Sequence, residues 1–344
     1  MPELGTVGST FADRFRIVEK VAEGEMGAVV VAEQVSGGPR VALKLLDVDI
    51  MNDDQLAGFS DEVHPGVEND HIVQVVEADV DPSTRCPWIA MELLEGEDLQ
   101  TRVAREGLLA PPEMIRIVGA ICDALCATHD HGRAHAGLTP ENVFLSSEGE
   151  VKVRELGFAR FMVEVFASQG EVIGDPPWMA PEQFKPGAPA TPAADIWTIG
   201  LLSFWMLTGR SFWKRAADPN ASITAQLREI VRAPLEPAST RAASYGLAKR
   251  VPAWFDAWFA RCVARVPSER FADARAALSE LEQAAKVEEP EAEPAEKVEE
   301  TPEPPAEEPA AEPEDAAEPE DAAELTPGAA TEEAPPSSGL PDEA

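Results

Sequence analysis

The residues whose types and spacing most clearly suggest a chemical role are a glycine-rich stretch and a lysine that follows it. The stretch is Ala22-Glu23-Gly24-Glu25-Met26-Gly27-Ala28-Val29, and the lysine is Lys44 in the run Val41-Ala42-Leu43-Lys44. The backbone N–H groups of a glycine-rich loop and a nearby ammonium group can together hold phosphate groups. One such glycine pattern is weak evidence by itself, so its meaning depends on the residues that accompany it.

A second group, Cys122, Cys126 and His129, has the i, i+4, i+7 spacing of one helical face and could in principle bind a metal ion. No fourth ligand is evident in the sequence, and a cysteine inside a helix usually behaves as a small apolar core residue. We therefore expect this group to pack inside the protein.

The pattern around these residues places strands first and helices afterwards. Val-rich runs separated by Gly37-Gly38 predict a hairpin within residues 15–46, a polar helix follows at 52–63, and a second strand pair covers 71–80 and 87–94. Beyond Gly96 the apolar residues repeat every three or four positions, and the run 197–207 is apolar on every side, as in a buried helix. This order predicts an α+β protein with a small sheet lobe and a larger helical lobe.

Composition separates the last part of the 344-residue chain from the rest. Residues 286–344 carry 21 acidic residues, 12 prolines, two lysines and no aromatic residue, which predicts a disordered tail. The net charge of −35 disfavours nucleic acid or an anionic membrane as the main partner. We expect a cytoplasmic protein, because no membrane span or signal peptide is evident and the four cysteines show no paired spacing.

The motifs and their order resemble those of the bacterial eukaryotic-like serine/threonine protein kinases, over about residues 15–281. After the glycine-rich stretch and the lysine run, the matching segments are Met91-Glu92-Leu93-Leu94 (hinge), His135-Ala136-Gly137-Leu138-Thr139-Pro140-Glu141-Asn142 (catalytic loop), Val153-Arg154-Glu155-Leu156-Gly157 (D-F-G segment), Met179-Ala180-Pro181-Glu182 (A-P-E motif), Asp195-Ile196-Trp197 and Arg270. The resemblance implies a bilobal kinase-like fold at 15–285, with an N-lobe at 15–95 and a C-lobe at 96–285. An extension at 1–14 would precede this domain, and the acidic tail at 286–344 would follow it.

The resemblance also implies a site between the lobes for ATP with Mg²⁺ or Mn²⁺. Glu62 matches the helical glutamate that pairs with Lys44, and Asn142 and Glu155 match the metal ligands of the family. The full set of positions that match nucleotide-contacting residues is Gly24, Gly27, Val29, Ala42, Lys44, Glu62, Glu92, Leu94, Asn142 and Phe144.

Four positions depart from the family at the reaction centre. Gly137 stands in place of the aspartate that acts as the base, and Thr139 replaces the catalytic-loop lysine. Glu155 replaces the D-F-G aspartate, and Asp175 replaces the threonine that supports the base. Losing a positioned general base costs roughly 10²–10⁴ in rate. We interpret the chain as a pseudokinase with no catalytic residue, in which metal binding by Asn142 and Glu155 is doubtful.

Nucleotide binding stays open from the sequence. Ala22 replaces the first loop glycine, Glu25 puts a negative charge at the loop tip, and Pro65-Gly66 should end the helix that carries Glu62. Weak or metal-independent binding of ATP and an empty pocket are both compatible with these residues.

Residues that support the fold match the family better than the reacting residues do. Glu182 and Arg270 resemble the buried ion pair of the helical lobe, and Asp195 should accept hydrogen bonds from the catalytic-type loop. His135 should pack inside the lobe as a structural group rather than replace the missing base.

Together these observations predict a cytoplasmic pseudokinase that serves as a scaffold or regulatory binding module in a bacterial Ser/Thr phosphorylation pathway. Its expected partner is a protein, either an active kinase or a kinase substrate. The alternative is a weakly active ATP-dependent serine/threonine protein kinase, or another transferase, that uses Lys44, Asn142 and Glu155.

Overall fold

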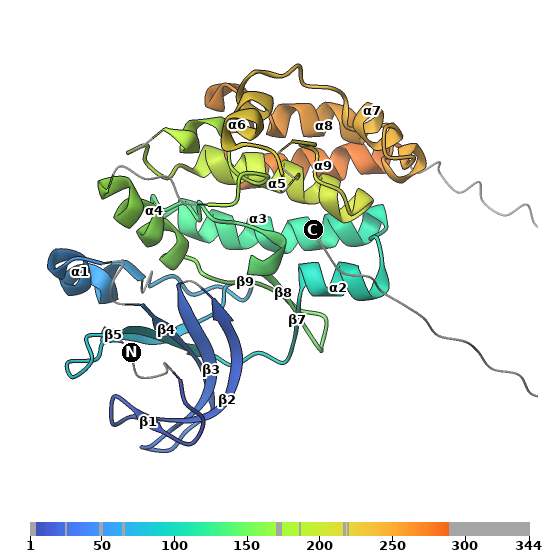
Figure 1. Cartoon of the computed structure of the whole chain (residues 1–344). Coiled ribbons are helices and arrows are strands. Elements are labelled where there is room, and N and C mark those ends of the chain that lie inside the picture. Colours follow the sequence, from blue (N-terminus) through green and yellow to red (C-terminus); the bar gives the residue numbers. More distant parts are fainter. Residues whose placement is uncertain are drawn as a thin grey trace, which may run out of the picture. The chain divides into compact units, whose positions relative to one another are not determined.

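The computed structural model describes residues 5–24, 26–47, 51–63, 66–169, 174–185, 187–215, 218 and 220–288 (Figure 1). The chain divides into two units, Met1–Ala292 and Glu293–Ala344, and all described residues lie in the first unit. Glu25, Pro65 and the acidic tail from residue 289 onward lie outside the described residues. The expectations that rest on them remain predictions.

The first part of the unit is a six-stranded antiparallel sheet, as the Val-rich runs predict. Its strand order is β1-β2-β3-β4-β6-β5. One face of the sheet packs onto buried side chains that include Phe15, Leu43 and Trp88. Within the predicted extension at 1–14, residues 10 and 11 form a strand that pairs with β2. The strands are β1 (Thr10–Phe11), β2 (Phe15–Gly24), β3 (Gly27–Gln34), β4 (Val41–Leu46), β5 (Val75–Val80) and β6 (Pro87–Glu92).

Helix α1 (Asp53–Val63) covers the sheet next to β5 and β6. Its buried side chains, Leu56, Phe59 and Val63, recur at the three- and four-residue spacing of one helical face. Two aspartates stand in the first turn, where the N-terminal helix dipole favours negative charge. The helix ends at Val63, just before the Pro65-Gly66 step in the sequence.

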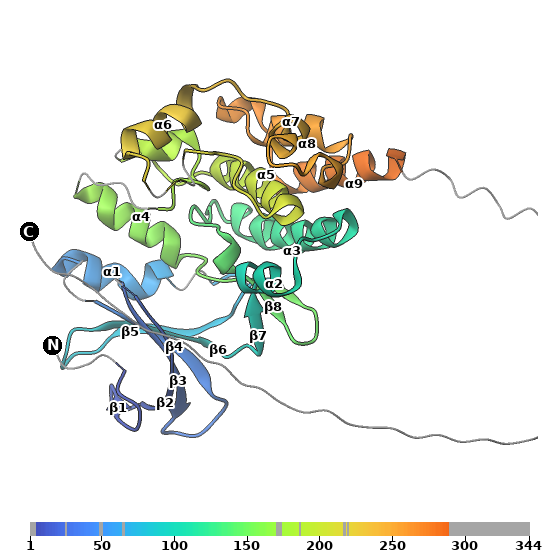
Figure 2. The same ribbon diagram turned by 45° about the vertical axis from the view of Figure 1, so that its right-hand side comes forward.

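The second part is helical, which confirms the α+β prediction, and α5 lies at its centre in both views (Figures 1 and 2). Helix α5 begins with Pro192 and ends at Gly209, whose left-handed φ of 61° closes the helix. Nearly all of its side chains are buried, as the all-apolar run predicts. No helix in the described part of the chain is long and apolar enough to cross a membrane. The helices are α2 (Leu99–Glu106), α3 (Pro111–His129), α5 (Pro192–Thr208), α6 (Ile223–Arg232), α7 (Ala238–Ala243), α8 (Phe255–Cys262) and α9 (Ala274–Glu288), beside a small sheet of β7 (Gly96–Asp98), β8 (Val143–Ser146) and β9 (Val151–Val153).

A buried ion pair ties the helical lobe together, as predicted. The Arg270 guanidinium donates to both carboxylate oxygens of Glu182, at 2.6 and 2.8 Å. It also donates to the carbonyl oxygens of Ala264 and Ala193, at 2.8 and 2.6 Å, and lies over the ring of Trp197. Every face of this guanidinium is therefore occupied by the fold.

Helix α4 (Phe158–Ser168), which the sequence analysis did not anticipate, lies between the sheet and the helical lobe and next to α1 in both ribbon views (Figures 1 and 2). Its buried side chains, among them Phe161 and Val165, join a cluster with Phe59 of α1 and Ile89 of β6. The rings of Phe59 and Phe161 meet edge to face at 5.6 Å. The core of the small lobe is thus completed by a helix that follows β9 in the chain.

Candidate functional site

The sheet face toward the helical lobe carries three of the predicted nucleotide residues. Strand pairing sets Val29 of β3 beside Lys44 of β4, and Ala42 beside Met91 of β6. Residues alternate along β4, so Ala42 and Lys44 share the face opposite the sheet core that contains Leu43. Val29, Ala42 and Lys44 are half-buried on this common face.

The two matching glycines lie where the β2–β3 hairpin turns. Gly24 and Gly27 oppose each other as the last pair of the ladder. Gly27 has a φ of 131°, and a Cβ atom there would lie 1.9 Å from the carbonyl oxygen of Leu45. The approach of β3 to β4 therefore requires a glycine at this position, independently of any phosphate.

At the hinge, Glu92 is held by neighbours that the sequence analysis missed. Its Oε1 atom accepts hydrogen bonds from the Lys152 ammonium at 2.8 Å and from the backbone N–H of Gln74 at 2.9 Å. Leu94 and Phe144 are half-buried in the same region between the lobes. The Glu92 carboxylate is therefore already engaged within the protein.

The predicted phosphate-binding lysine is paired with the D-F-G position itself. The Lys44 ammonium donates to Oε1 of Glu155 at 2.5 Å, and it lies 3.9 Å from the centre of the Phe158 ring. Burial opposes ionisation of Glu155, but the charge and hydrogen bond of Lys44 outweigh it and hold the pKa of that carboxyl below its usual value. The one positive charge that matches the family's phosphate-binding lysine is therefore already neutralised.

Glu62, the predicted partner of Lys44, pairs instead with a residue of helix α4. Its carboxylate lies 3.8 Å from the Arg160 guanidinium, while Lys44 pairs with Glu155. Helices α1 and α4 contact each other along their apolar faces. The sequence analysis doubted the Lys44–Glu62 pair because of the helix break, and the structure shows a second reason, which is the presence of α4.

The catalytic-type loop is built as the sequence predicts. Asp195 accepts hydrogen bonds from the backbone N–H groups of His135 and Ala136, both at 2.9 Å. His135 is fully buried and hydrogen-bonds through Nε2 to the carbonyl oxygen of Arg154 at 2.9 Å, so its role is structural. The side-chain amide of Asn142 donates to the carbonyl oxygen of Gly137 at 2.9 Å, which ties the loop to itself.

The position of the family's catalytic base is filled from outside the loop. A Cβ atom on Gly137 would lie 2.6 Å from the Cβ atom of Ala159 in the first turn of α4. Real Cβ atoms do not approach other carbon atoms this closely, because the repulsion rises steeply below contact distance. Any side chain at position 137 therefore competes with α4 for the same space.

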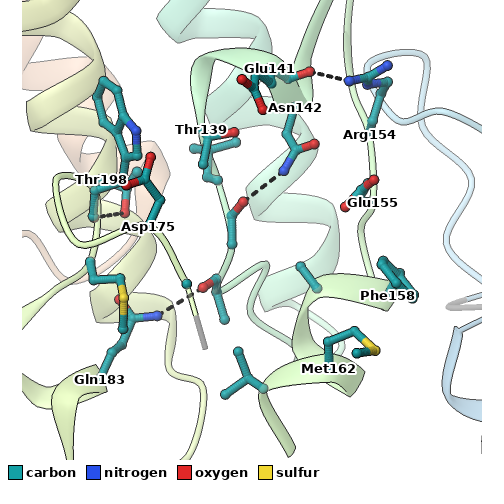
Figure 3. A pocket seen from close by; sticks show the side chains of 18 of the residues that line it. Thr139, Glu141, Asn142, Arg154, Glu155, Phe158, Met162, Asp175, Gln183 and Thr198 are labelled. Atoms are coloured by element: carbon teal, nitrogen blue, oxygen red, sulfur yellow. Dashed lines mark hydrogen bonds between the residues drawn. The ribbon is translucent and has the colours of Figure 1, made fainter. Parts of the chain in front are cut away.

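A cavity of about 320 Å³ lies between the catalytic-type loop, α4 and the segment before the A-P-E motif (Figure 3). Thr139, Asn142 and Glu155 line one side of it, and Phe158 and Met162 of α4 line another. The wall thus offers a hydroxyl, an amide and an engaged carboxylate among apolar side chains. The cavity can bind a small polar molecule, but at position 137 it presents no group able to accept a proton.

Asp175 lies at the edge of the same cavity, and although the residue as a whole is exposed, its carboxyl is partly withdrawn from water. Burial raises the pKa of its carboxyl and the charge of Glu141 adds to this, while a hydrogen bond to Trp178 acts in the opposite direction. Because the folded-state pKa lies above the unfolded value, the charged form destabilises the fold at neutral pH, and this cost disappears as the pH falls through the raised pKa.

We therefore expect Asp175→Asn to raise the melting temperature at pH 7, and the gain to shrink toward about pH 4, near the ordinary pKa of an aspartate. Thermal unfolding of both proteins across this pH range measures the difference. Asp70→Asn, at an exposed aspartate that does not line the cavity, is the matched control and should change little. An unchanged or lower melting temperature for Asp175→Asn at pH 7 contradicts this account.

The residues present do not fit a divalent metal ion. Glu155 is taken by Lys44, and the Asn142 amide is oriented by its bond to Gly137. In the described segments no group of three or more His, Cys, Asp or Glu side chains is placed to hold a metal ion. Cys122 and Cys126 are buried, and burial raises the pKa of both thiols.

A small antiparallel sheet lobe, a helical lobe and a lysine-containing cleft between them define the architecture of a protein kinase. The sequence matches the family model described as "Protein kinase domain" over residues 15–281. The chain belongs to the protein kinase family.

The most similar proteins found include bacterial serine/threonine kinases. The chain is 35% identical over 207 residues to the probable serine/threonine-protein kinase PknB of Lactococcus lactis. The aligned region covers 59% of this chain and 33% of that protein. It is 29% identical to the serine/threonine-protein kinase PknL of Mycobacterium tuberculosis, with 79% of this chain and 66% of that protein covered. The chain thus spans between a third and two thirds of the length of these relatives.

Solved structures agree on the fold. The crystal structure of the Mycobacterium tuberculosis PknI kinase domain superposes with a TM-score of 0.62 at 23% identity, and the match covers 82% of this chain and 99% of that one. The crystal structure of Rad53 1-466 in complex with AMP-PNP gives a TM-score of 0.61 at 21% identity. At this level of identity the likeness supports the fold alone.

The main feature missed from the sequence is α4, although the sequence carries a signal for it. Phe158, Phe161, Met162, Val165 and Phe166 recur at positions i, i+3, i+4, i+7 and i+8, which is the spacing of one helical face. The motif match assigned this stretch to the segment after D-F-G and drew attention away from its periodicity. No sequence pattern indicates that Glu155 replaces Glu62 as the partner of Lys44.

Proposed function

We propose that this kinase-family chain is a pseudokinase, a cytoplasmic scaffold or regulatory binding module of a bacterial Ser/Thr phosphorylation pathway with little or no phosphotransfer. The observation that carries the proposal is the contact between Gly137 and α4. The base position has no side chain, and Ala159 occupies the space that a side chain there would need. A positioned general base contributes roughly 10²–10⁴ to rate. The carboxylates that line the cavity, Glu141, Glu155 and Asp175, stand at other positions than that of the family's base.

The state of Lys44 supports the same proposal. In phosphoryl transfer the lysine holds the nucleotide phosphates, and the D-F-G carboxylate holds the metal ion. Here the two groups neutralise each other at 2.5 Å. Each therefore reduces the ability of the other to bind its usual ligand.

The adenine side of the cleft is better preserved than the phosphate side. Val29, Ala42 and Phe144 offer half-buried apolar surface that suits a flat ring. ATP that entered this cleft would have to compete with Glu155 for Lys44, so we propose that any nucleotide binding is weak and does not depend on a metal ion.

The proposal is tested by measuring phosphate transfer from radiolabelled ATP to the chain itself and to casein, with Mg²⁺ or Mn²⁺. We expect the full chain and its Lys44→Met variant to give the same background signal. Lys249→Met, at an exposed turn of the helical lobe, is the matched control for loss of a lysine. A metal-dependent signal that Lys44→Met abolishes and Lys249→Met retains would establish the alternative, a slow kinase or other transferase using Lys44, Asn142 and Glu155.

A further inference from the structure

Helix α6 carries a basic hollow on a strongly acidic protein. The hollow, of about 690 Å³, is lined by Arg215, Arg228 and Arg232 together with Ser222, Thr224, Ala225, Glu229 and Ala233. Helix α6 lies at the end of the helical lobe away from the sheet in both ribbon views, so this surface is separate from the cleft (Figures 1 and 2).

The three guanidinium groups of this hollow are gathered on one surface and are not used by the fold. Most described arginines, such as Arg14 and Arg270, pair with a carboxylate or a carbonyl oxygen. Among the residues that the structure places, Arg215, Arg228 and Arg232 have no ion-pair or side-chain hydrogen-bond partner. Like charges four residues apart on a helix repel each other, so Arg228 and Arg232 weaken the isolated helix rather than support it.

The usual structural uses of these charges are met by other residues. Arg265 donates to the carbonyl oxygens of Ile230 and Ala233, so the C-terminal end of α6 does not depend on Arg232. The Glu229 carboxylate accepts hydrogen bonds from the backbone N–H groups of Lys214 and Arg215, at 3.1 and 2.6 Å. Its carboxylate is thus engaged in holding the loop before α6.

Exposed aliphatic side chains lie on and beside the same helix. Ile223 is 62% exposed, Val231 39% and Leu235 37%. Apolar side chains next to unpaired arginines are typical of a surface that binds a peptide, with the aliphatic groups buried by contact and the arginines paired to an anion.

We propose that the α6 surface binds a segment of a partner protein that carries a phosphorylated serine or threonine beside apolar residues. Arginine forks form paired, charge-assisted hydrogen bonds with phosphate oxygens, and one doubly charged phosphate can neutralise two guanidinium groups. The Ser222 and Thr224 hydroxyls add donors at the rim. A nucleic acid carries the same group, but its repeated charges are repelled by a chain of net charge −35.

This proposal specifies the partner of the binding module proposed above, and it rests on that proposed function. Its evidence comes from α6 alone, so it holds whether or not the cleft between the lobes is active. Phosphopeptide binding and phosphate transfer are measured separately, so the failure of one proposal can be told from the failure of the other.

The test measures fluorescence anisotropy of the full chain with a labelled peptide pool in which one phosphothreonine is flanked by mixed Leu, Ile and Val. Parallel pools carry threonine or glutamate at that position, and a labelled single-stranded oligonucleotide is a fourth probe. We expect saturable binding of the phosphothreonine pool, weakened by salt and about tenfold or more weaker for the other three probes.

The double variant Arg228→Ala/Arg232→Ala should weaken binding of the phosphothreonine pool by about tenfold or more. The matched control, Arg16→Ala/Arg40→Ala, removes the same charge from the exposed face of the sheet and should bind as the parent does. Both arginine pairs are exposed, so both variants should keep the parent's melting temperature.

Equal binding by the two double variants, or no binding of the phosphothreonine pool, would overturn the proposal. Equal binding of the glutamate pool would show that the surface takes any anionic peptide, and tighter arginine-dependent binding of the oligonucleotide would reassign it to nucleic acid. Either result contradicts the phosphopeptide assignment.

Discussion

Replacing Gly137 with alanine is expected to lower the free energy of unfolding by about 1–3 kcal/mol, which is the usual cost of forcing an extra group into a packed site. The new Cβ atom would meet the Cβ atom of Ala159 at 2.6 Å, and both atoms sit on backbone that the fold holds in place. The backbone at Gly137 does not have the positive φ that strains other residues, so the effect isolates the steric contact.

A double-mutant cycle separates this contact from general effects of the substitutions. Ala159→Gly alone should cost about 1 kcal/mol because glycine is a poor helix former, and the combined variant should be more stable than the sum of the two changes predicts. Gly58→Ala in α1, where an added Cβ atom meets nothing within 4 Å, is the matched control and should stabilise the protein slightly. Denaturant unfolding of the parent and the four variants measures these effects. Additive effects of the two substitutions would show that α4 does not pack against the loop in solution.

The same contact determines how a carboxylate can be introduced at position 137. Aspartate at position 137 cannot be accommodated while Ala159 stays in place, so Gly137→Asp alone is expected to displace α4 and to expose the apolar side chains of Phe161 and Val165. The absence of a side chain at position 137 and the packing of α4 are therefore linked in this chain. An attempt to recover phosphate transfer has to change both positions together.

Arg270→Met is expected to destabilise the protein by about 3–5 kcal/mol, the range seen when one partner of a buried ion pair is removed. The Arg270 side chain is fully buried, whereas Glu182 keeps 18% of its side chain exposed. The substitution leaves the Glu182 carboxylate without its cation and frees the carbonyl oxygens of Ala193 and Ala264.

Two further variants test the cause of this loss. Adding Glu182→Gln removes the unpaired charge, so the double variant Arg270→Met/Glu182→Gln should recover part of the lost stability. Arg275→Met breaks an ion pair with Asp130 in which both side chains are 66% exposed, and it should change stability little. Chemical unfolding of the four proteins gives the comparison. Equal effects of Arg270→Met and Arg275→Met would mean that burial of the pair does not matter.

The order of the elements could be predicted because it depends on local patterns. Runs rich in valine and leucine produce β3 and β4, and the apolar run after Pro192 produces a helix buried on nearly all sides. The scaffold contacts of Asp195 and Arg270 followed from motif positions, and the structure confirms both. These features are set by neighbours in sequence or by motifs with one fixed geometry.

The cleft could not be predicted to the same depth, because its contacts join segments that are distant in the chain. Lys44 and Glu155 are separated by 111 positions, and either Glu62 or Glu155 could reach the lysine on the basis of the motifs alone. The periodicity of Phe158 to Phe166 indicates a helix but not the surface that buries it. Where this helix packs depends on the space left beside Gly137, which Ala159 of α4 fills. This contact is evident only when the loop and α4 are considered together.

Helix α4 also has a mechanical consequence. Its apolar face belongs to the core of the small lobe, while its first residue follows directly on the Glu155-Leu156-Gly157 segment that leads from the helical lobe. Rotation of one lobe against the other must therefore strain that short connection or pull Phe161 out of contact with Phe59. Helix α4 therefore couples the two lobes, because its packing against α1 and the sheet restricts how far one lobe can rotate against the other.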